Sequence, residues 1–447
     1  MKKALAIILA FSMLFTLFAC AKGGVPQTQD ETQTVHTGDS PVTEDIWDIL
    51  TEYFSESPTE QEVCSVPLQF SKFSNPCISV EPTPALLSAD FALNLFAAIG
   101  EKENTLISPV SIILALCLAA EGADGETLTQ IENALGRDIS ALRYLFGEYI
   151  ANKAESKELK IANSVWLNNQ KNRLTVEENF LNTCKNRYAA EVFSEDFDDA
   201  TAKKINRWVS DNTDGAIKNL ISRIPPHAVI YLINTVLFDA EWQSQYLESQ
   251  IHDGIFNNSD GTRSNVKMMF SQEYDYFRLG KTNGIVKKYA AGKYAFAAML
   301  PDEGVSLKDA LASFSGEEFL NAVTNTGFKN TNVRLPQFEF ESQLSLRDIL
   351  PALGIKDAFD SSKADFSRMG KSSFGPLFID EVYHKTFIRV AEKGTKAGAA
   401  TAVIMADSCA PFEPPFELTF DRPFIYAIIE TDTGMPVFFG TVTNFNQ

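Results

Sequence analysis

The sequence predicts an α+β fold. Helix-like patterns dominate the first half of the folded region and strand-like runs dominate the second half. This order does not fit alternating βαβ units, which would mix the two along the chain. The composition, 45% apolar and 22% charged over 447 residues, is that of a globular protein with ample material for a large core.

The helical segments come first along the folded region. Apolar residues recur at helical spacing between residues 91 and 99. Ser108 and Pro109 then open an apolar helix over 110–121, because Ser is a favoured cap and Pro is tolerated in the first turn. Further helices are expected at 126–135, 138–153, 175–187 and 199–212.

Strand-like runs lie between and after these helices. They are rich in β-branched and aromatic residues and are bounded by turn-forming residues. We expect strands at 160–167, 228–238, 294–300, 332–340, 378–390 and 424–439.

The N-terminus has the pattern of an export signal. Lys2 and Lys3 precede the apolar stretch 4–18, which is too short to span a membrane comfortably. The stretch ends in Leu-Phe-Ala-Cys at Cys20, which resembles a bacterial lipobox, in which the Cys is diacylated and becomes the new N-terminus. We therefore expect a signal peptide at 1–19 and a lipidated Cys20, with ordinary secretion as the alternative.

The segment 20–84 differs from the rest of the chain. After Cys20 it carries eleven acidic residues and two basic ones, with Thr, Ser, Gln and Pro between them. This composition predicts an extended, self-repelling linker. Cys64 and Cys77 form either a local disulfide, which is permitted outside the cytoplasm, or two free thiols. The folded domain is expected at 85–447.

The charge excludes one class of partner and the N-terminus suggests a location. The net charge is −19, and removal of the two N-terminal lysines makes it −21. With no basic block, a nucleic-acid partner is not expected. No later apolar run reaches spanning length. We expect an extracytoplasmic protein held on a bacterial membrane or cell surface by its acyl chains, or secreted if Cys20 is not modified.

The sequence carries no recognisable catalytic signature. It lacks the nucleophile elbow, the Walker and dinucleotide-binding glycine patterns, a zinc-protease His-Glu-x-x-His and any Cys-x-x-Cys. Its four histidines have no metal-ligand spacing. We therefore expect neither an enzyme nor a metal or cofactor, although a hydrolase with an unrecognised site remains an alternative.

The segment 392–405 is unusual in composition. It is built of small and β-branched residues without Pro, and Lys396 falls on the opposite face from the alternating set that begins at Thr395. Flexible loops are usually polar and central strands are usually rich in Val and Ile. This segment fits neither type, so we expect it to be compatible with both an exposed loop and a strand within a sheet.

Several motifs in one order resemble the serpin family over about residues 85–446. No single motif is decisive, but their shared order is specific. The motifs are Asn104–Ile112, Ile161–Trp166, Ile205–Val209, Thr213–Ile217, Asn234–Phe238 with Trp242, Leu335–Phe338, Phe378–Val390 with His384, the segment from Glu392, Asp421–Phe424 and Phe439–Asn444.

The resemblance implies the serpin fold, with a large and mostly antiparallel central sheet, smaller sheets, about eight or nine helices and an exposed reactive loop. Lys396, Gly398 and Thr235 stand where the family more often has Glu, Ala and Ala. None of these places a charge or Pro on the face expected to be buried. The resemblance therefore implies an inhibitor, with a non-inhibitory binding protein of the same fold as the alternative.

The resemblance also implies site residues. The reactive bond is expected at Ser408–Cys409, with Met405–Ala406 and Asp407–Ser408 as alternatives. Small residues there suit elastase-like or subtilisin-like serine proteases as targets, attacking a monomeric inhibitor. Glu392 is expected to pair with Lys288. The hinge residues are Glu392, Gly394, Thr395, Ala397, Ala399, Ala400 and Thr401, and the sheet-opening residues are Ser108, Ser111, Asn234, Trp242, Lys288 and His384.

Overall fold

The computed structural model describes residues 83–100, 103–170, 174–226, 228–373, 375–395 and 414–445. The expected signal peptide, the lipidation site Cys20 and the acidic linker with Cys64 and Cys77 lie outside these residues. Within them, no helix has the length and apolar character needed to cross a membrane.

The first two helices of the described residues begin with capping side chains. Thr83 caps α4 (Pro84–Ile99) and Ser108 caps α5 (Pro109–Gly122), each followed by Pro in the first turn. All but one residue of α5 is buried, so this helix is a central element of the core. The other helices are α6 (Gly125–Leu135), α7 (Ile139–Lys153), α8 (Glu178–Tyr188), α9 (Asp199–Asn212), α10 (Leu307–Leu311), α11 (Gly316–Thr324) and the 3-10 turns η2 (Glu248–Gln250), η3 (Leu346–Asp348), η4 (Leu350–Leu353) and η5 (Asp357–Phe359).

The largest sheet has nine strands, all antiparallel to their neighbours except for the parallel pair β11–β16. Its central strands are buried along their whole length and read as continuous apolar runs. The order is β1 (Thr105–Ile107), β18 (Pro436–Val442), β17 (Phe424–Glu430), β10 (Tyr294–Pro301), β9 (Thr282–Lys288), β8 (Arg263–Leu279), β11 (Gly327–Pro336) and β16 (Phe416–Thr419), with β7 (Ile251–Asn257) also paired to β8.

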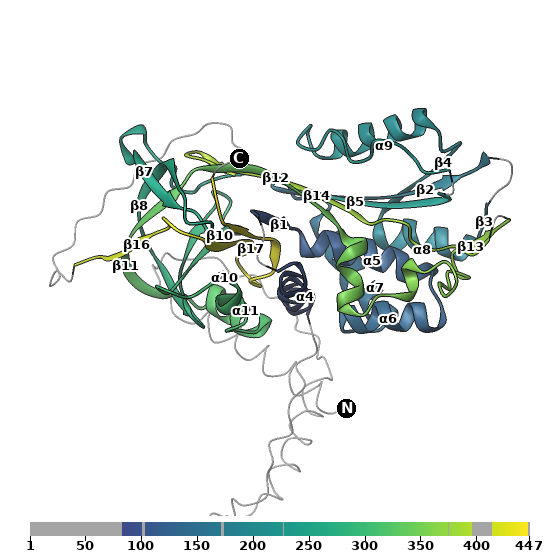
Figure 1. The fold of residues 1–447 in the computed structure, drawn as a ribbon, viewed down its shortest axis with the longest axis horizontal. Helices are drawn as coiled ribbons and strands as arrows, with labels where there is room; N and C mark the ends of the chain where they lie inside the picture. Colours follow the sequence, from purple (N-terminus) through teal and green to yellow (C-terminus); the bar gives the residue numbers. More distant parts are fainter. Residues whose placement is uncertain are drawn as a thin grey trace, which may run out of the picture. The chain divides into compact units, whose positions relative to one another are not determined.

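A second layer of strands is divided into two sheets. One is β4 (Ala190–Glu195), β2 (Leu159–Asn168) and β5 (Ile230–Phe238), and the other is β12 (Phe338–Ser345), β14 (Tyr383–Val390), β15 (Gly394–Thr395) and β6 (Ala240–Glu241). Because β6 follows β5 after a single residue, the two sheets belong to one layer, and Figure 1 shows β12, β14, β5 and β2 running alongside one another. A small separate sheet pairs β13 (Gly370–Ser372) with β3 (Leu174–Val176).

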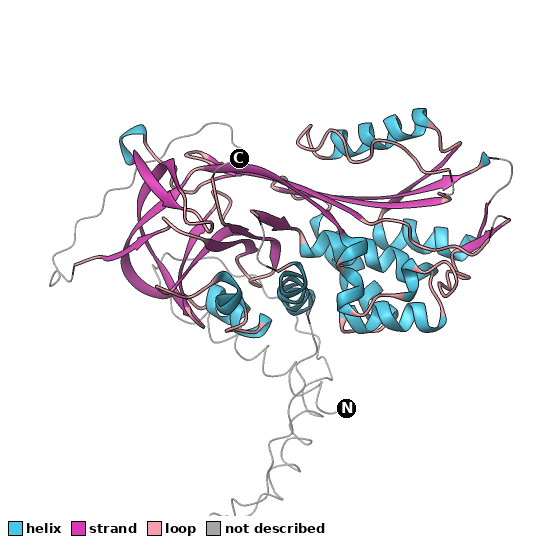
Figure 2. Ribbon diagram, viewed as in Figure 1, coloured by secondary structure: helices cyan, strands magenta, loops and turns pink. Residues whose placement is uncertain are grey.

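Helices cover both faces of this divided layer (Figure 2). On one face, α5 packs against β5 and forms part of the larger hydrophobic core. On the other face, α9 contacts β2 and β5 through its own apolar cluster, which includes Trp166, Ile205, Trp208 and Ile233. Among the described residues, helices therefore lie on both faces of the layer near β5.

The α+β prediction is confirmed, and the differences lie at element ends. The helix expected from residue 175 begins at Glu178, because Leu174–Val176 pairs with β13. The strand expected at 332–340 is two strands that meet at Gln337. The run 378–390 is regular only from Tyr383, and 424–439 contains the turn that joins β17 to β18.

Candidate functional site: a divided sheet and its hinge

The hinge begins as a tight turn at the end of β14. The Ala391 N–H donates to the Gly394 carbonyl at 3.1 Å, and the Gly394 N–H donates to the Ala391 carbonyl at 3.3 Å. Thr395 then lies opposite Val390 in an antiparallel pair. The chain has therefore already reversed direction when it reaches Thr395 and runs back alongside β14.

The other edge of β15 is paired as well. Gly394 lies opposite Glu241 and Thr395 lies opposite Ala240, so β15 stands between β14 and β6. A Cβ at Gly394 would lie 2.2 Å from the Ala240 carbonyl oxygen. Only glycine therefore fits this close approach between backbones.

Thr395 is buried, with 3% of its surface exposed. Its hydroxyl forms a 2.6 Å hydrogen bond with the Tyr289 hydroxyl. Burial raises the pKa of Tyr289 above its ordinary value, so the phenol stays neutral. The pair satisfies both hydroxyls without a charge, and a larger or charged residue at position 395 would lose this arrangement.

Trp242 holds the turn from the side of β6. Its indole N–H donates to the Ala391 carbonyl at 2.8 Å, and its backbone N–H donates to the Lys393 carbonyl at 2.9 Å. The indole also stacks on Tyr289, with ring centroids 4.5 Å apart and planes 9° from parallel. Trp242 therefore joins the turn to the residue that binds Thr395.

The expected Glu392–Lys288 ion pair is wrong. Glu392 Oε2 instead accepts a hydrogen bond from Gln337 Nε2 at 3.0 Å. Lys288 pairs with Asp275 at 2.9 Å, because Asp275 lies on β8, the strand paired with β9. The hinge turn is thus held by a neutral amide rather than by a cation.

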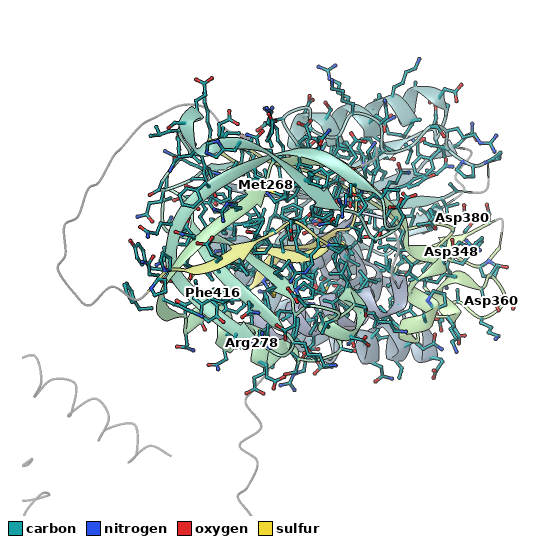
Figure 3. The ribbon with its side chains drawn as sticks, turned by 60° about the vertical axis from the view of Figure 1, so that its left-hand side comes forward. Met268, Arg278, Asp348, Asp360, Asp380 and Phe416 are labelled. Carbon is teal, nitrogen blue, oxygen red and sulfur yellow. The ribbon has the colours of Figure 1, made fainter. Side chains whose placement is uncertain are left out.

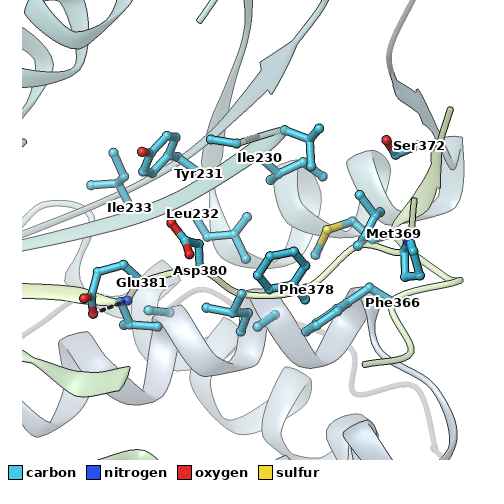
Figure 4. A pocket seen from close by; sticks show the side chains of 18 of the residues that line it. Ile230, Tyr231, Leu232, Ile233, Phe366, Met369, Ser372, Phe378, Asp380 and Glu381 are labelled. Carbon is cyan, nitrogen blue, oxygen red and sulfur yellow. Dashed lines mark hydrogen bonds between the residues drawn. The ribbon is translucent and has the colours of Figure 1, made fainter. Parts of the chain in front are cut away.

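The sheet opens below the hinge. Among the described residues, no backbone hydrogen bond joins β5 to β14 or to the segment 375–382 that precedes it. A cavity of about 540 Å³ separates these two edges. Figure 4 shows it from close by, with apolar side chains from both edges and from below, among them Ile230, Leu232, Met369 and Phe378.

A second cavity, of about 10 Å³, lies further up the same division and brings four predicted residues together: Ser108, Ser111, Asn234 and His384. Asn234 Nδ2 donates to Asn163 Oδ1 at 2.8 Å. Within the described part of the chain, Asn234 Oδ1 and Thr235 Oγ1 are buried without a hydrogen-bond partner. Each such group costs about 1–3 kcal/mol.

His384 connects β14 to the start of α5. Its Nε2 accepts a hydrogen bond from the Ser108 N–H at 3.1 Å, which requires the neutral ring. Burial lowers the pKa of His384 to about 4, because the imidazolium would be cut off from water. Thr386, two residues along β14, donates to the Leu106 carbonyl at 2.8 Å and adds a second link.

The remaining predicted residues lie outside the described part of the chain: Ala397, Ala399, Ala400, Thr401, Met405, Ala406, Asp407, Ser408 and Cys409. Of the predicted sheet-opening residues, Trp242 lies at the hinge and Lys288 takes no part in either cavity. Sequence reasoning missed Tyr289 and Gln337, although Tyr289 directly follows Lys288 and Gln337 lies within the quoted Leu-Pro-Gln-Phe motif. No cluster of His, Cys, Asp or Glu able to hold a metal occurs in the residues described.

Comparison with known proteins identifies the family. The family model described as "Serpin (serine protease inhibitor)" matches residues 87–445. The chain belongs to the serpin family. It is 31% identical over 366 residues to an uncharacterised serpin-like protein of Thermococcus kodakarensis, covering 79% of this chain and 84% of that protein.

Further serpins support this assignment. Leukocyte elastase inhibitor A of Mus musculus is 31% identical over 373 residues, covering 79% of this chain and 97% of that protein. The native-state crystal structure of tengpin, a thermophilic serpin, matches with a TM-score of 0.75 and 39% identity, covering 81% of this chain and 94% of that one. The serpin fold expected from the sequence, with a large sheet, smaller sheets and helices in the predicted number, is confirmed.

The pKa of His384 generates a stability prediction. Between pH 6.5 and about 4 the unfolded chain binds a proton that the folded chain does not, so the free energy of unfolding falls as the pH falls through this range. The loss is on the order of 3 kcal/mol, and above pH 6.5 this contribution is complete. Urea unfolding of wild type and His384→Gln from pH 4 to 7.5 measures it. The substitution should remove this part of the slope, and equal slopes in both proteins would contradict the assignment.

Proposed function

We propose that this serpin is a suicide inhibitor of serine proteases, in which cleavage of the reactive loop lets the hinge continue into the divided sheet. The observation that carries the proposal is the position of β15. Gly394 and Thr395 are already paired with β6, and Thr395 also with β14, at the head of the opening between β5 and β14. Insertion would extend a strand that has already started.

The register of β15 supports the expected reactive bond. Thr395 lies opposite Ala240 on one side and opposite Val390 on the other, both antiparallel. If this register continues unbroken, Ser408 falls between Pro226 and Ala228 on one edge and opposite Leu377 on the other. Pro226, Ala228 and Leu377 all line the larger cavity. On this register, insertion as far as about Ser408 would run the length of the larger cavity, with the two strand edges moving apart to admit the chain.

Insertion would supply hydrogen-bond partners for the strand edges on either side of the opening. A new strand would form roughly 10–20 backbone hydrogen bonds, each with a net value of about 0.5–1.5 kcal/mol. It would fill the apolar cavity and bring donors to the level of Asn234 Oδ1 and Thr235 Oγ1. The total, on the order of 10 kcal/mol or more, is comparable to the whole free energy of unfolding of a typical domain.

The chemistry that precedes insertion is the acylation step of an ordinary serine protease. The protease serine attacks the carbonyl carbon of residue 408, the ester bond forms and the peptide bond to Cys409 breaks, with the proton passing to the new amine. Water would normally hydrolyse the ester. Insertion instead carries the ester-linked protease toward the far end of the opening and pulls on its active site, so hydrolysis stops with the protease trapped.

The small residues around the expected bond support a target with a shallow primary pocket, elastase-like or subtilisin-like. The name of the mouse relative, leukocyte elastase inhibitor A, points to the same class for that protein. In this proposal the chain is a substrate that the protease cannot release, not an enzyme. One inhibitor molecule binds one protease molecule.

The N-terminal sequence supports an extracytoplasmic location, on a bacterial membrane through lipidated Cys20. Cys20→Ser should move the protein from the membrane fraction to the soluble secreted fraction, and the wild-type N-terminal peptide should carry two or more acyl chains by mass spectrometry. An unmodified wild-type peptide would show that the protein is secreted without an anchor.

The trapping proposal is tested with an elastase-like serine protease. Wild type should form a complex that survives boiling in SDS. Thr395→Arg should be cleaved without trapping, because a guanidinium cannot take the buried position beside Tyr289, and the number of inhibitor molecules consumed per protease should rise at least tenfold. Thr395→Ser keeps the hydroxyl and serves as the matched control. A Thr395→Arg variant that traps with wild-type stoichiometry would refute the insertion mechanism, and a wild type that forms no complex would favour the non-inhibitory binding protein.

A further inference from the structure

Two solvent-exposed aromatic side chains stack on each other on the large sheet. Phe328 is 85% exposed and Tyr274 is 44% exposed, and their ring centroids lie 5.2 Å apart with planes 11° from parallel. Single exposed apolar residues are ordinary on protein surfaces, whereas contiguous ones mark interaction sites. Stacking joins these two rings into one apolar surface.

A second aromatic group follows these two residues along β8 and β11 and reaches β16, the strand that comes after the reactive loop. Lys329 Nζ lies 3.6 Å from the Phe416 ring centroid and 4.2 Å from the Tyr276 centroid, and these two rings meet edge to face at 5.6 Å. We call Tyr274, Tyr276, Phe328, Lys329 and Phe416 the aromatic platform. Figure 3 shows Phe416 at the outer end of its strand.

The aromatic platform lies on paired strands. Its residues belong to β8, β11 and β16, and the β8–β11 register is irregular between Phe328 and Thr331. The Tyr274 hydroxyl donates to Gln272 Oε1 at 3.1 Å and the Tyr276 hydroxyl donates to Asn283 Oδ1 at 2.8 Å. Rigid aromatic surfaces lose little conformational entropy on binding, which is why they are common anchors at interfaces.

The length of the loop determines what can reach the platform. The eight residues from Ser408 to Phe416 span at most about 28 Å, whereas the thirteen from Thr395 to Ser408 span up to about 45 Å. A protease bound at residue 408 is therefore held close to the platform by the shorter arm of the loop. This places the body of the attacking protease within reach of Phe328 and Tyr274.

We propose that the aromatic platform is a docking surface for the attacking protease, which contacts Phe328 and Tyr274 through an apolar patch beside its active-site cleft. This rests on the proposed function and adds a second contact outside the loop. The platform acts only before insertion. Once the bond is cut, the shorter arm stays with Phe416 while the protease leaves with the other arm.

Because the platform acts before insertion, it should affect the association rate but not the stoichiometry of inhibition. Platform contacts stabilise the encounter complex, so their loss lowers the association rate. They are absent during insertion, so their loss leaves unchanged the number of inhibitor molecules consumed per trapped protease. A change that merely disturbed the fold would alter that number and the melting temperature as well.

The test measures association rates with an elastase-like protease for wild type, Phe328→Ala and the double variant Tyr274→Ala with Phe328→Ala. The control is Tyr144→Ala on α7, which removes an aromatic side chain that is 69% exposed and lies outside the platform. We expect the rate to fall about threefold to thirtyfold in the platform variants and less than twofold in the control. Stoichiometry and melting temperature should match wild type in all three variants.

Three outcomes overturn the proposal. Equal association rates in all variants, with normal trapping, would leave the inhibitor function standing and remove the docking surface. A wild-type dimer that becomes monomeric in the platform variants, with unchanged rates, would show that a second copy of this chain covers the platform. A wild type that traps no protease would refute the proposed function itself, and the docking proposal with it.

Discussion

The structure depends on one constraint: two neighbouring strands, β5 and β14, lie in the same layer without pairing. Unpaired backbone groups inside a protein are costly, and proteins usually cover or pair the edges of their sheets. Here α5 and α9 pack on opposite faces of the layer at β5. Only a strand entering from the end can pair both edges, and β15 already occupies that entrance.

The hinge places the first two residues of a strand between β6 and β14, and the rest of that strand would follow only on insertion. Trp242 and Gln337 fix the turn with uncharged donors, an indole N–H and a side-chain amide, and Gly394 permits the close approach of three backbones. Beyond Thr395 the chain is still tied to β16 through the uncut loop. Because β16 belongs to the other sheet, the proposed mechanism requires a cut in the loop before the chain can continue along the opening. In this proposal, the energy of insertion is withheld by chain connectivity rather than by a strained contact.

The sequence predicted features that depend on residues adjacent in the chain, such as the start of a helix. It predicted few contacts that depend on which residues of two strands lie opposite one another. The Ser108–Pro109 signal placed the start of α5 correctly, and the resemblance to serpins brought Ser108, Ser111, Asn234 and His384 together as found. The Lys288 pairing failed because it depends on which residue of another strand lies opposite. Phe328 was not identified because a single aromatic between Gly327 and Lys329 carries no sequence pattern that tells an exposed ring from a buried one.

The central claim is that the intact chain is held in a shape less stable than one it can reach after a single cut. Thermal unfolding of intact protein and of protein nicked once between residues 396 and 413 tests it most directly. A gain on the order of 10 kcal/mol from insertion should raise the melting temperature of the nicked sample by roughly 10–15 °C or more, for a folded region of this size. A nicked protein that melts at or below the temperature of the intact one would contradict the account.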